Sequence, residues 1–312
     1  EDGIRDCLLS RGLGDVYKRQ IPYYVLDYTE SFSKNVVDNF TQMYAQGLTP
    51  NPCVECNRSV KFDHFISQAK KLNCDKVATG HYAKIIKKNN EYELHKADYL
   101  DKDQSYVLHM LKSSDLENIS FPLGEISKPD VRQIAARIGL KTAFKKDSQD
   151  ICFVGKKDYR SFVEKRIDLT APGEILDTEG NKVGDHNGIH EFTVGQRKGL
   201  PGGYGSPRYV TKINVQNKNV TIGERNDLLV SSFIVEELSC VNDLEYKNLT
   251  IQTRYNSEDL PCEIKKLSDT KVLVQLKEPA FGVAPGQFGV IYNGTKVVCG
   301  GRISPKVLEN VG

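Results

Sequence analysis

Hydrophobic residues in the first part of the chain recur with two different periods. Residues 29–47 carry apolar side chains at helical spacing, and Gly47 ends that pattern. A second helical pattern covers 60–72, and the short apolar run at 75–81 predicts a buried strand. With another strand expected at 21–26, the order strand, helix, helix, strand predicts a parallel α/β sheet. Ligands of such sheets bind beyond the carboxyl ends of the strands.

The rest of the chain changes gradually to strand-like patterns. Residues 83–97 predict a hairpin that turns at Asn89 and Asn90, and Ser127 is the expected N-cap of a helix that Gly139 closes. In the second half the helical spacing disappears. Short apolar runs between Gly, Asn, Asp and Pro predict small β domains, either a sandwich or a barrel. The expected strands are 208–215, 219–223, 250–255, 272–276, 288–292 and 296–299.

Composition narrows the class of protein. A chain of 312 residues is long enough for two or three domains, and a net charge of +2 does not by itself indicate a nucleic-acid partner. We find no stretch of 18 apolar residues and no signal-peptide pattern, which argues against a membrane or secreted protein and predicts a cytoplasmic one. The cysteines are too sparse for a disulfide scaffold and fit one or two working thiols. They are Cys7, Cys53, Cys56, Cys74, Cys152, Cys240, Cys262 and Cys299.

Two polar loops built around cysteines carry the candidate chemistry. They are 49–57 (TPNPCVECN) and 145–155 (KKDSQDICFVG), and both leave a thiol accessible. Two lysine pairs flank Cys152, and a nearby cation lowers the pKa of a thiol and raises its thiolate fraction. Two such thiols suit sulfur relay, in which one carries a persulfide and the other attacks it or resolves it through a disulfide.

The pair Cys53 and Cys56 has several interpretations. A Cys-x-x-Cys is half of a structural zinc site, but the chain has no second pair of ligands at suitable spacing. The two cysteines could also be inert packing residues. We favour a reactive thiol at Cys56, and the alternative is an iron–sulfur cluster held by Cys53, Cys56 and Cys152 with one iron open to sulfide.

Three further polar segments allow both structural and functional interpretations. In 79–82 (TGHY) a glycine follows a predicted strand, so a ligand could approach closely; a buried structural role is the simpler interpretation of His81. Segments 102–106 (KDQSY) and 195–200 (GQRKGL) combine amide, cationic and aromatic groups. Such loops suit contacts to RNA phosphates and bases, and they equally suit solvated turns.

Five motifs occur in one order: Asn51, Pro52, Cys56 and Asn57 with Lys61 and Phe62; 78–82; 102–106; 146–148 with 151–153; and 195–200. Together they resemble the bacterial tRNA-specific 2-thiouridylases, and the resemblance runs from Ile21 to Ser304. It implies a parallel α/β domain of the PP-loop, adenine-nucleotide hydrolase-like type at 21–160. A central β-rich, tRNA-binding domain at 161–226 and a C-terminal β-barrel at 227–306 follow.

The resemblance implies an activity and its residues. The family makes 2-thiouridine at the wobble position: ATP, with Mg²⁺, adenylates the uridine C2 oxygen, and a cysteine persulfide supplies sulfur. By matched position, Cys152 carries a persulfide received from a donor protein, and Cys56 is the nucleophile that forms a transient disulfide with it. Cys56 attacks either the persulfide or the activated base. The other implied contacts are Asn51, Pro52 and Cys53 with the target base, Gly80 with ATP, and His81, Lys102, Asp103, Gln104, Arg254, Tyr255 and Gln287 with tRNA.

Two departures from the family pattern change these expectations. The family opens with a Ser-Gly-Gly-Val-Asp-Ser loop that holds the ATP phosphates, whereas residues 1–20 form an atypical leader without it. We therefore expect a chain that lacks the family's N-terminal part and binds tRNA but not ATP; the rival function is a tRNA-binding fragment without catalysis. Many members carry Asp, a candidate general acid/base, where this chain has Cys53. A PP-loop ligase is disfavoured because ligation needs no thiol.

Overall fold

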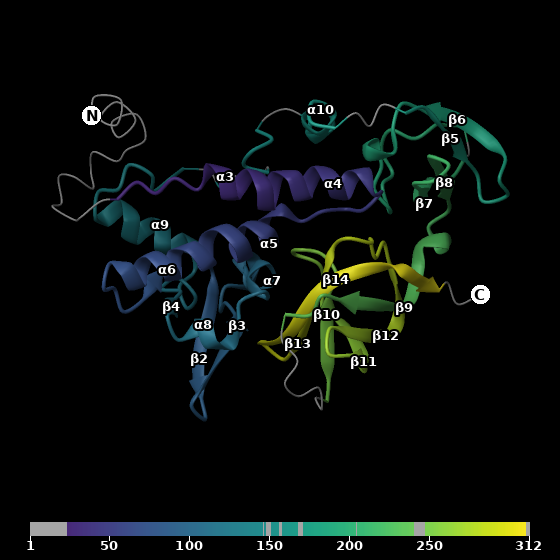
Figure 1. Cartoon of the computed structure of the whole chain (residues 1–312). Coiled ribbons are helices and arrows are strands. Elements are labelled where there is room, and N and C mark those ends of the chain that lie inside the picture. The colour runs from purple at the N-terminus through teal and green to yellow at the C-terminus, as the bar shows by residue number, and fades with distance from the viewer. Residues whose placement is uncertain are drawn as a thin grey trace.

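The computed structural model describes residues 24–145, 147, 151–155, 158–167, 171–203, 205–239 and 247–309. Within that part the chain forms a helical and mixed α/β region, then a central four-stranded sheet, then a C-terminal barrel (Figure 1). In the same part no helix has both the length and the apolar character needed to cross a membrane. Outside it lie the leader at 1–20, the start of the strand expected at 21–26, Cys7, Cys240, Lys146, Lys156 and Lys157.

The first helical pattern forms one continuous helix made of α3 (Thr29–Phe32), η1 (Ser33–Asp38) and α4 (Asn39–Ala45). Its buried face contains Val36, Val37, Phe40, Met43 and Tyr44, as the spacing predicted. Gly47 follows with a φ of +66°, which ends the helix. The expected strand before it is wrong in the described part, because residues 24–26 are exposed and form no strand.

The second helical pattern also forms one continuous helix, made of α5 (Pro52–Cys56), η2 (Asn57–Phe62) and α6 (Asp63–Lys71). It leads to β1 (Val77–Ala78), which pairs in parallel with β4 (Ile119–Ser120). The expected parallel α/β arrangement is therefore confirmed, with β1 and β4 as the parallel pair of this region among the described residues. Between these strands lie η3 (Leu100–Lys102), α7 (Ser105–Leu108) and α8 (Ser113–Leu116).

The predicted hairpin and the predicted capped helix are both confirmed. The hairpin consists of β2 (Ala83–Lys88) and β3 (Glu91–Lys96), and its two turn asparagines have positive φ. Helix α9 (Lys128–Arg137) begins where the Ser127 hydroxyl accepts a hydrogen bond from the Asp130 amide. Its apolar face is not fully buried, because Ile134 and Ile138 are exposed.

The central region is a sheet with strand order β6-β5-β8-β7, preceded by α10 (Tyr159–Glu164). Its core contains Ile175, Phe192, Val210, Val220 and Ile222. Sequence patterns predicted β7 and β8 but not β5 and β6, which lie among glycines and charged residues. The elements are β5 (Gly173–Leu176), β6 (Lys182–His186), η4 (Ile189–Glu191), β7 (Tyr209–Asn214) and β8 (Asn219–Gly223).

The C-terminal region is a closed barrel with strand order β13-β10-β11-β12-β9-β14, and the β13–β14 pairing closes it. This confirms the barrel. The β2–β3 hairpin joins its outside, where His95 pairs with Lys296 of β14. The barrel therefore lies directly against the α/β region that carries the first cysteine loop. Its elements are η5 (Asn226–Leu228), β9 (Leu229–Glu236), β10 (Leu249–Gln252), β11 (Leu260–Ser268), β12 (Lys271–Phe281), β13 (Phe288–Asn293) and β14 (Lys296–Glu309).

Candidate active site

The two cysteine loops meet in space. Cys53 and Cys56 lie on α5, and Cys152 lies in the turn at 151–155. All three thiols are free; Cys53 and Cys152 are exposed and Cys56 is half-buried. Cys152 interacts electrostatically with both α5 thiols and raises the pKa of each. Residues almost a hundred positions apart thus share one site.

The α5 cysteines are protonated, although the neighbouring cation Lys61 favours their thiolate forms. Desolvation by the surrounding protein is the largest effect and raises the pKa of Cys53 and of Cys56, although Cys53 itself is solvent-exposed. Lys61 opposes this by favouring both thiolates, and the neighbouring thiols reinforce the increase. Both α5 cysteines therefore rest mainly as thiols near neutral pH.

Aromatic packing fixes the turn that carries Cys152. The Phe153 ring packs edge-on against Phe32 at 5.6 Å and Phe40 at 5.3 Å between ring centroids. Ile151 and Val154 pack into the same cluster. The α3–α4 helix thereby supports the second cysteine loop, and Cys152 remains exposed beside this apolar anchor.

His81 is a neutral imidazole near Lys61, the lysine that also acts on Cys53 and Cys56. Its ring packs against Phe62 and Phe121, and its Nδ1 lies 2.7 Å from the Thr79 hydroxyl. Desolvation, and then the charge of Lys61, lowers the pKa of His81 to about 4. Since Lys61 also acts on Cys56, the His81 segment and α5 border the same space. Gly80 is exposed next to it.

Asp103 and Gln104 of the 102–106 segment make intramolecular hydrogen bonds. The buried Asp103 carboxylate accepts hydrogen bonds from the Ala97 amide at 2.8 Å and the Ser105 hydroxyl at 2.6 Å. Burial raises the pKa of Asp103, and these hydrogen bonds oppose the increase. Gln104 Oε1 accepts from the Tyr82 amide. Contacts of Asp103 and Gln104 with tRNA remain a prediction, and the structure gives both residues a second role in shaping the loop.

A cluster of cations surrounds Asp147, in the second cysteine loop. Lys102 and Lys128 each place Nζ 3.1 Å from its carboxylate, and Arg132 lies 3.8 Å away. Lys102 and Lys128 hold the pKa of Asp147 below its ordinary value. The 102–106 segment and the second cysteine loop are thus joined electrostatically.

The expected barrel residues reach the site in different ways. Tyr255 is 40% exposed, and desolvation together with the charges of Asp103, Cys53 and Asp147 raises its pKa. Arg254 instead points into protein, where it donates to the Gly282 carbonyl at 2.7 Å and the Val194 carbonyl at 3.4 Å.

Gln287 holds the loop that precedes the first cysteines. Its amide nitrogen lies 3.3 Å from the carbonyl oxygens of both Thr49 and Pro50. Asn51 follows in extended conformation as the N-cap residue of α5, and the buried Pro52 begins the helix. The barrel therefore positions Asn51 and Pro52, two of the three residues expected at the target base.

Sequence analysis missed one ion pair that joins the barrel to α5. The Glu55 carboxylate is buried and lies 2.8 Å from the Arg302 guanidinium. No local signal could identify this pair, because its members are separated by most of the chain. In the sequence, Glu55 is one charged residue within the Cys53–Cys56 motif, and nothing near it indicates a distant partner.

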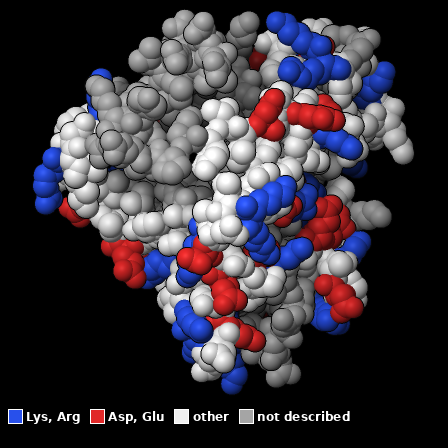
Figure 2. Space-filling view, turned by 60° about the vertical axis from the view of Figure 1, so that its left-hand side comes forward, with Lys and Arg blue, Asp and Glu red and all other residues white. Residues whose placement is uncertain are grey.

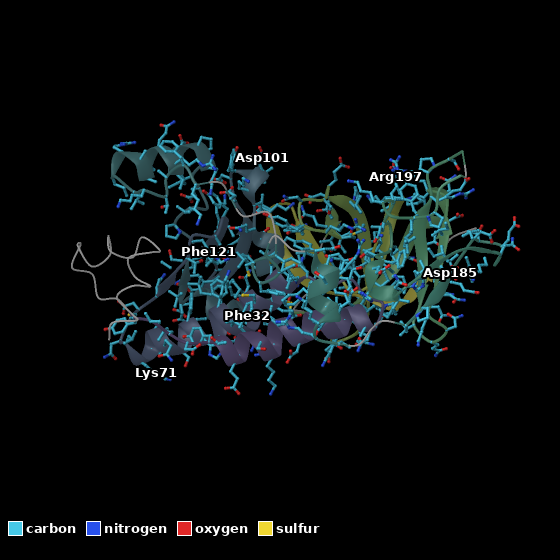
Figure 3. The ribbon with its side chains drawn as sticks, turned by 90° about the horizontal axis from the view of Figure 1, so that it is seen from above. Phe32, Lys71, Asp101, Phe121, Asp185 and Arg197 are labelled. Atoms are coloured by element: carbon cyan, nitrogen blue, oxygen red, sulfur yellow. The ribbon has the colours of Figure 1, made fainter. Side chains whose placement is uncertain are left out.

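On the face shown in Figure 2, positive and negative side chains of the described residues alternate. Figure 2 shows Lys and Arg interleaved with Asp and Glu over the described part of one face, which agrees with the small net charge. Arg197 and Lys198 of the 195–200 loop are exposed. Seen from above, the segments carrying Asp101 and Arg197 lie on the same side of the molecule, with the Phe32 helix toward the other side (Figure 3).

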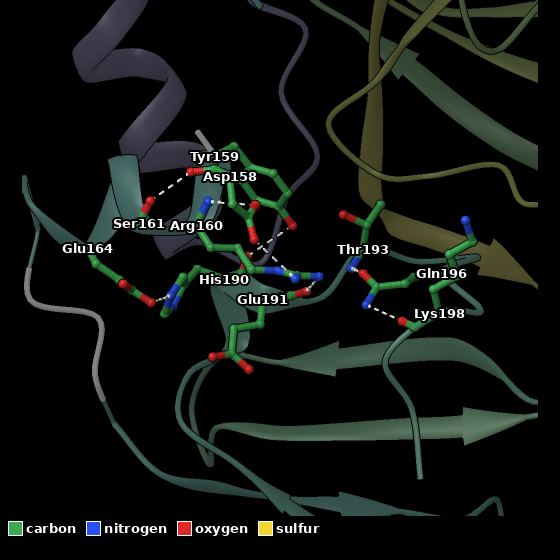
Figure 4. A network of polar contacts seen from close by, with 10 residues as sticks. All are labelled: Asp158, Tyr159, Arg160, Ser161, Glu164, His190, Glu191, Thr193, Gln196 and Lys198. Atoms are coloured by element: carbon green, nitrogen blue, oxygen red, sulfur yellow. Dashed lines mark hydrogen bonds and ion pairs between the residues drawn. The ribbon is translucent and has the colours of Figure 1, made fainter. Parts of the chain in front are cut away.

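One group among the described residues has the geometry of metal ligands: Glu164, His190 and Glu191, with ligand atoms within 4.8 Å of one another. His190 Nε2 already lies 3.0 Å from Glu164, and Arg160 donates to the Glu191 carbonyl (Figure 4). Tyr159 donates to the His190 carbonyl. These contacts join α10 to η4, and we assign the group a structural role. The three cysteines do not form such a group, so the thiol site is not preassembled for a single ion.

Three family models match successive parts of the chain. They are the tRNA methyl transferase HUP domain at 12–156, the tRNA methyl transferase PRC-barrel domain at 160–224 and the aminomethyltransferase beta-barrel domain at 230–303. The first match begins before Ile21, the expected start of the resemblance. A HUP-type α/β domain followed by two β domains, in this order, places the chain in a class of tRNA-modifying transferases.

Curated relatives identify the family. The tRNA-specific 2-thiouridylase MnmA of Chloroflexus aurantiacus is 40% identical over 97% of this chain and 88% of its own length. The Rickettsia prowazekii protein of the same name is 41% identical over 93% of this chain and 82% of its own length. The Lachnoclostridium phytofermentans protein is 40% identical over 91% and 81%. This chain belongs to the tRNA-specific 2-thiouridylase family.

Proposed function

We propose that this protein is a tRNA-uridine 2-sulfurtransferase that converts a wobble uridine to 2-thiouridine. The observation that carries the proposal is the meeting of Cys56 and Cys152 at one site in a chain of this family. Relatives of similar length are named for the same activity, which favours catalysis over the alternative of a tRNA-binding fragment.

The first step activates the base. The uridine C2 oxygen attacks the α-phosphorus of ATP, pyrophosphate leaves, and the oxygen becomes part of an adenylate that departs later as AMP. Mg²⁺ on the phosphates would neutralise the charge of the leaving pyrophosphate. We place the nucleotide near Gly80, after β1, in agreement with a HUP-domain match and with ligand binding beyond the carboxyl end of a parallel strand. This step requires the chain to bind ATP, so titration of the chain with ATP decides between the proposed activity and the expectation from sequence that ATP binding is lost.

The second step delivers sulfur. A donor protein places sulfane sulfur on Cys152, which is accessible to a partner. Cys56, once deprotonated, attacks the inner sulfur of the persulfide. A Cys56–Cys152 disulfide forms, hydrosulfide leaves and attacks C2, and AMP departs. An external dithiol must then supply two electrons to reduce the disulfide. In the alternative route Cys56 attacks the activated C2 and displaces AMP. The outer persulfide sulfur on Cys152 then displaces Cys56 from C2, and Cys56 attacks the inner sulfur, which releases 2-thiouridine and leaves the same Cys56–Cys152 disulfide.

Recognition of tRNA would combine bases and phosphates. We place Asn51, Pro52 and Cys53 at the target base because they lie directly before Cys56 at the start of α5. The neutral His81 offers a ring for base contacts, whereas Lys102 offers charge to phosphates. Tyr255, exposed near Cys53, suits stacking on a base.

The same thiols leave one alternative for sulfur delivery. Cys53, Cys56 and Cys152 would hold an iron–sulfur cluster, and thiolate ligands suit that group. The meeting of all three cysteines supports this arrangement as well as the relay. The variants below separate the two, because a cluster needs every one of its ligands.

Serine variants of the full chain test the proposal. With a persulfide donor, Cys152→Ser should abolish thiolation, since a hydroxyl cannot hold sulfane sulfur, while tRNA binding persists. Cys56→Ser should also block thiolation but leave a persulfide on Cys152 detectable by mass spectrometry. Cys74→Ser, at an exposed thiol elsewhere, is the matched control and should keep activity. Bleached visible absorption in Cys53→Ser, Cys56→Ser and Cys152→Ser alike would instead indicate a cluster. Full activity of Cys152→Ser would refute both schemes.

A further inference from the structure

Helix α5 has two chemically different faces. Cys53 and Cys56 are three positions apart, so they share the side that meets Cys152. Val54 and Glu55 are buried on the other side. A buried carboxylate is costly unless it is paired and hydrogen-bonded, so the partners of Glu55 determine how α5 is held.

Glu55 binds two arginines. Arg58, on the same helical segment, contacts one carboxylate oxygen at 2.5 Å, and Arg302 contacts the other at 2.8 Å. The Arg302 side chain is only 11% exposed, whereas that of Arg58 is 41% exposed. Of these two ion pairs, the one with Arg302 joins the barrel to α5.

The barrel holds Arg302 in a defined orientation. Its guanidinium donates to the Gly286 carbonyl and lies 4.9 Å from the centre of the Phe288 ring. The turn before β13 contacts the chain just before α5 as well: the Thr49 amide donates to the Pro285 carbonyl at 2.9 Å. The barrel therefore holds both the loop that enters α5 and the buried side of α5 itself.

We propose that Arg302 is a positioning residue for sulfur transfer: through Glu55 it sets the orientation of α5 and thereby the placement of the Cys56 sulfur. Residues 52–56 are the N-terminal end of the continuous helix at 52–71, where no preceding helical turn restrains the backbone, so tertiary contacts with the barrel determine how this end is held. The inference rests on the proposed role of Cys56, but its structural part concerns the exposure of that thiol and is measurable without turnover.

The test compares variants by the rate at which iodoacetamide alkylates Cys56, followed by peptide mass spectrometry across pH. Arg302→Met and Glu55→Gln should each increase that rate about tenfold, because α5 opens more often and the thiol is less desolvated. The same variants should thiolate tRNA more slowly, through kcat more than KM. A thiol that is more reactive but transfers sulfur less well indicates lost positioning. Arg58→Met, which keeps the barrel contact, is the matched control and should stay close to the wild-type protein.

Buried barrel thiols report general unfolding. Cys262 and Cys299 should remain unmodified in each variant. If Arg302→Met exposes them, Glu55→Gln, which leaves the barrel side chains intact, decides the question. Unchanged Cys56 alkylation in both variants would overturn the proposal. If Cys152→Ser thiolated tRNA fully, the proposed function would fail, while the alkylation result would still report whether Arg302 positions α5.

Discussion

Buried imidazoles give this protein a specific response to acid. His109 is buried, its Nδ1 donates to the Tyr106 carbonyl, and its Nε2 is among the described buried atoms without a hydrogen-bond partner. Burial lowers the pKa of His109 to about 4. Between about pH 4 and pH 6.5, His109 is therefore neutral in the folded protein and protonated in the unfolded chain, where its pKa has the ordinary value of about 6.5.

We predict that His109 makes the fold less stable as pH falls from about 6.5 to about 4, by about 3 kcal/mol in total. Above that range its contribution should be constant. Urea unfolding of the wild-type protein and of His109→Gln at pH 7.5, 6, 5 and 4.5 measures this, and the variant should show a smaller loss toward acid pH. Equal slopes for the two proteins would contradict the prediction.

Lys102 and His81, which we expect to contact tRNA, differ in charge near neutral pH. Lys102→Gln should reduce the slope of log binding constant against log salt concentration by about one, because a phosphate contact is lost. His81→Gln should weaken binding without changing that slope, since the imidazole is neutral at the pH of the assay. Filter binding between low and moderate salt distinguishes them, and equal slope changes would show that our assignment of contacts is wrong.

At the residue scale, sequence was informative where chemistry is local. The sequence around the cysteines predicts polar loops, and Cys152 does interact with the cysteines of the first loop. The raised pKa of Cys56 could not be predicted, since the desolvation comes from segments that fold around it. The Glu55–Arg302 pair is equally non-local. From the sequence we interpreted Asp103 and Gln104 as groups available to RNA or solvent, but both make intramolecular hydrogen bonds.

At the element scale, the turn before β13 has little tolerance for change. Gly286 has a φ of +88°, and a β-carbon there would lie 2.8 Å from the Leu48 β-carbon and the Thr49 amide nitrogen. Both the backbone conformation and the close approach require glycine.

Gly286→Ala should therefore destabilise the protein by about 1–3 kcal/mol and displace the 48–50 loop, with loss of thiolation. Gly294→Ala is the control: its φ is +59°, but no atom of the described residues lies within 4 Å of the added methyl group, so backbone strain is the expected effect. Thermal unfolding and single-turnover thiolation compare the two. A Gly294 variant as impaired as the Gly286 variant would mean that the contact with the loop is unimportant.

Element predictions succeeded where local periodicity and turn chemistry agree. Asn89 and Asn90 both adopt positive φ, as a tight hairpin requires. The prediction failed at residues 24–26, since an apolar run becomes a strand only when a neighbouring strand pairs with it. Strand β11 was missed because alternate positions carry Lys and Glu on the exposed barrel surface.

At the scale of the whole molecule, three parts converge on one thiol site. The α/β region supplies Cys56, the turn packed on the α3–α4 helix supplies Cys152, and the barrel holds the loop before α5 through Gln287. The sequence predicted the order of the domains along the chain, with a β-barrel at the C-terminal end. It could not predict that the barrel touches the cysteine helix, because such contacts depend on docking and not on periodicity.

The most direct test of this account follows one sulfur atom. Wild-type protein is loaded with ³⁵S-labelled persulfide from a donor protein, the label is located at Cys152 by peptide mapping, and tRNA is added with or without ATP in a single turnover. The account predicts that ³⁵S leaves Cys152 and appears in 2-thiouridine only when ATP is present. Thiolated tRNA without label, while ³⁵S remains on Cys152, would contradict it.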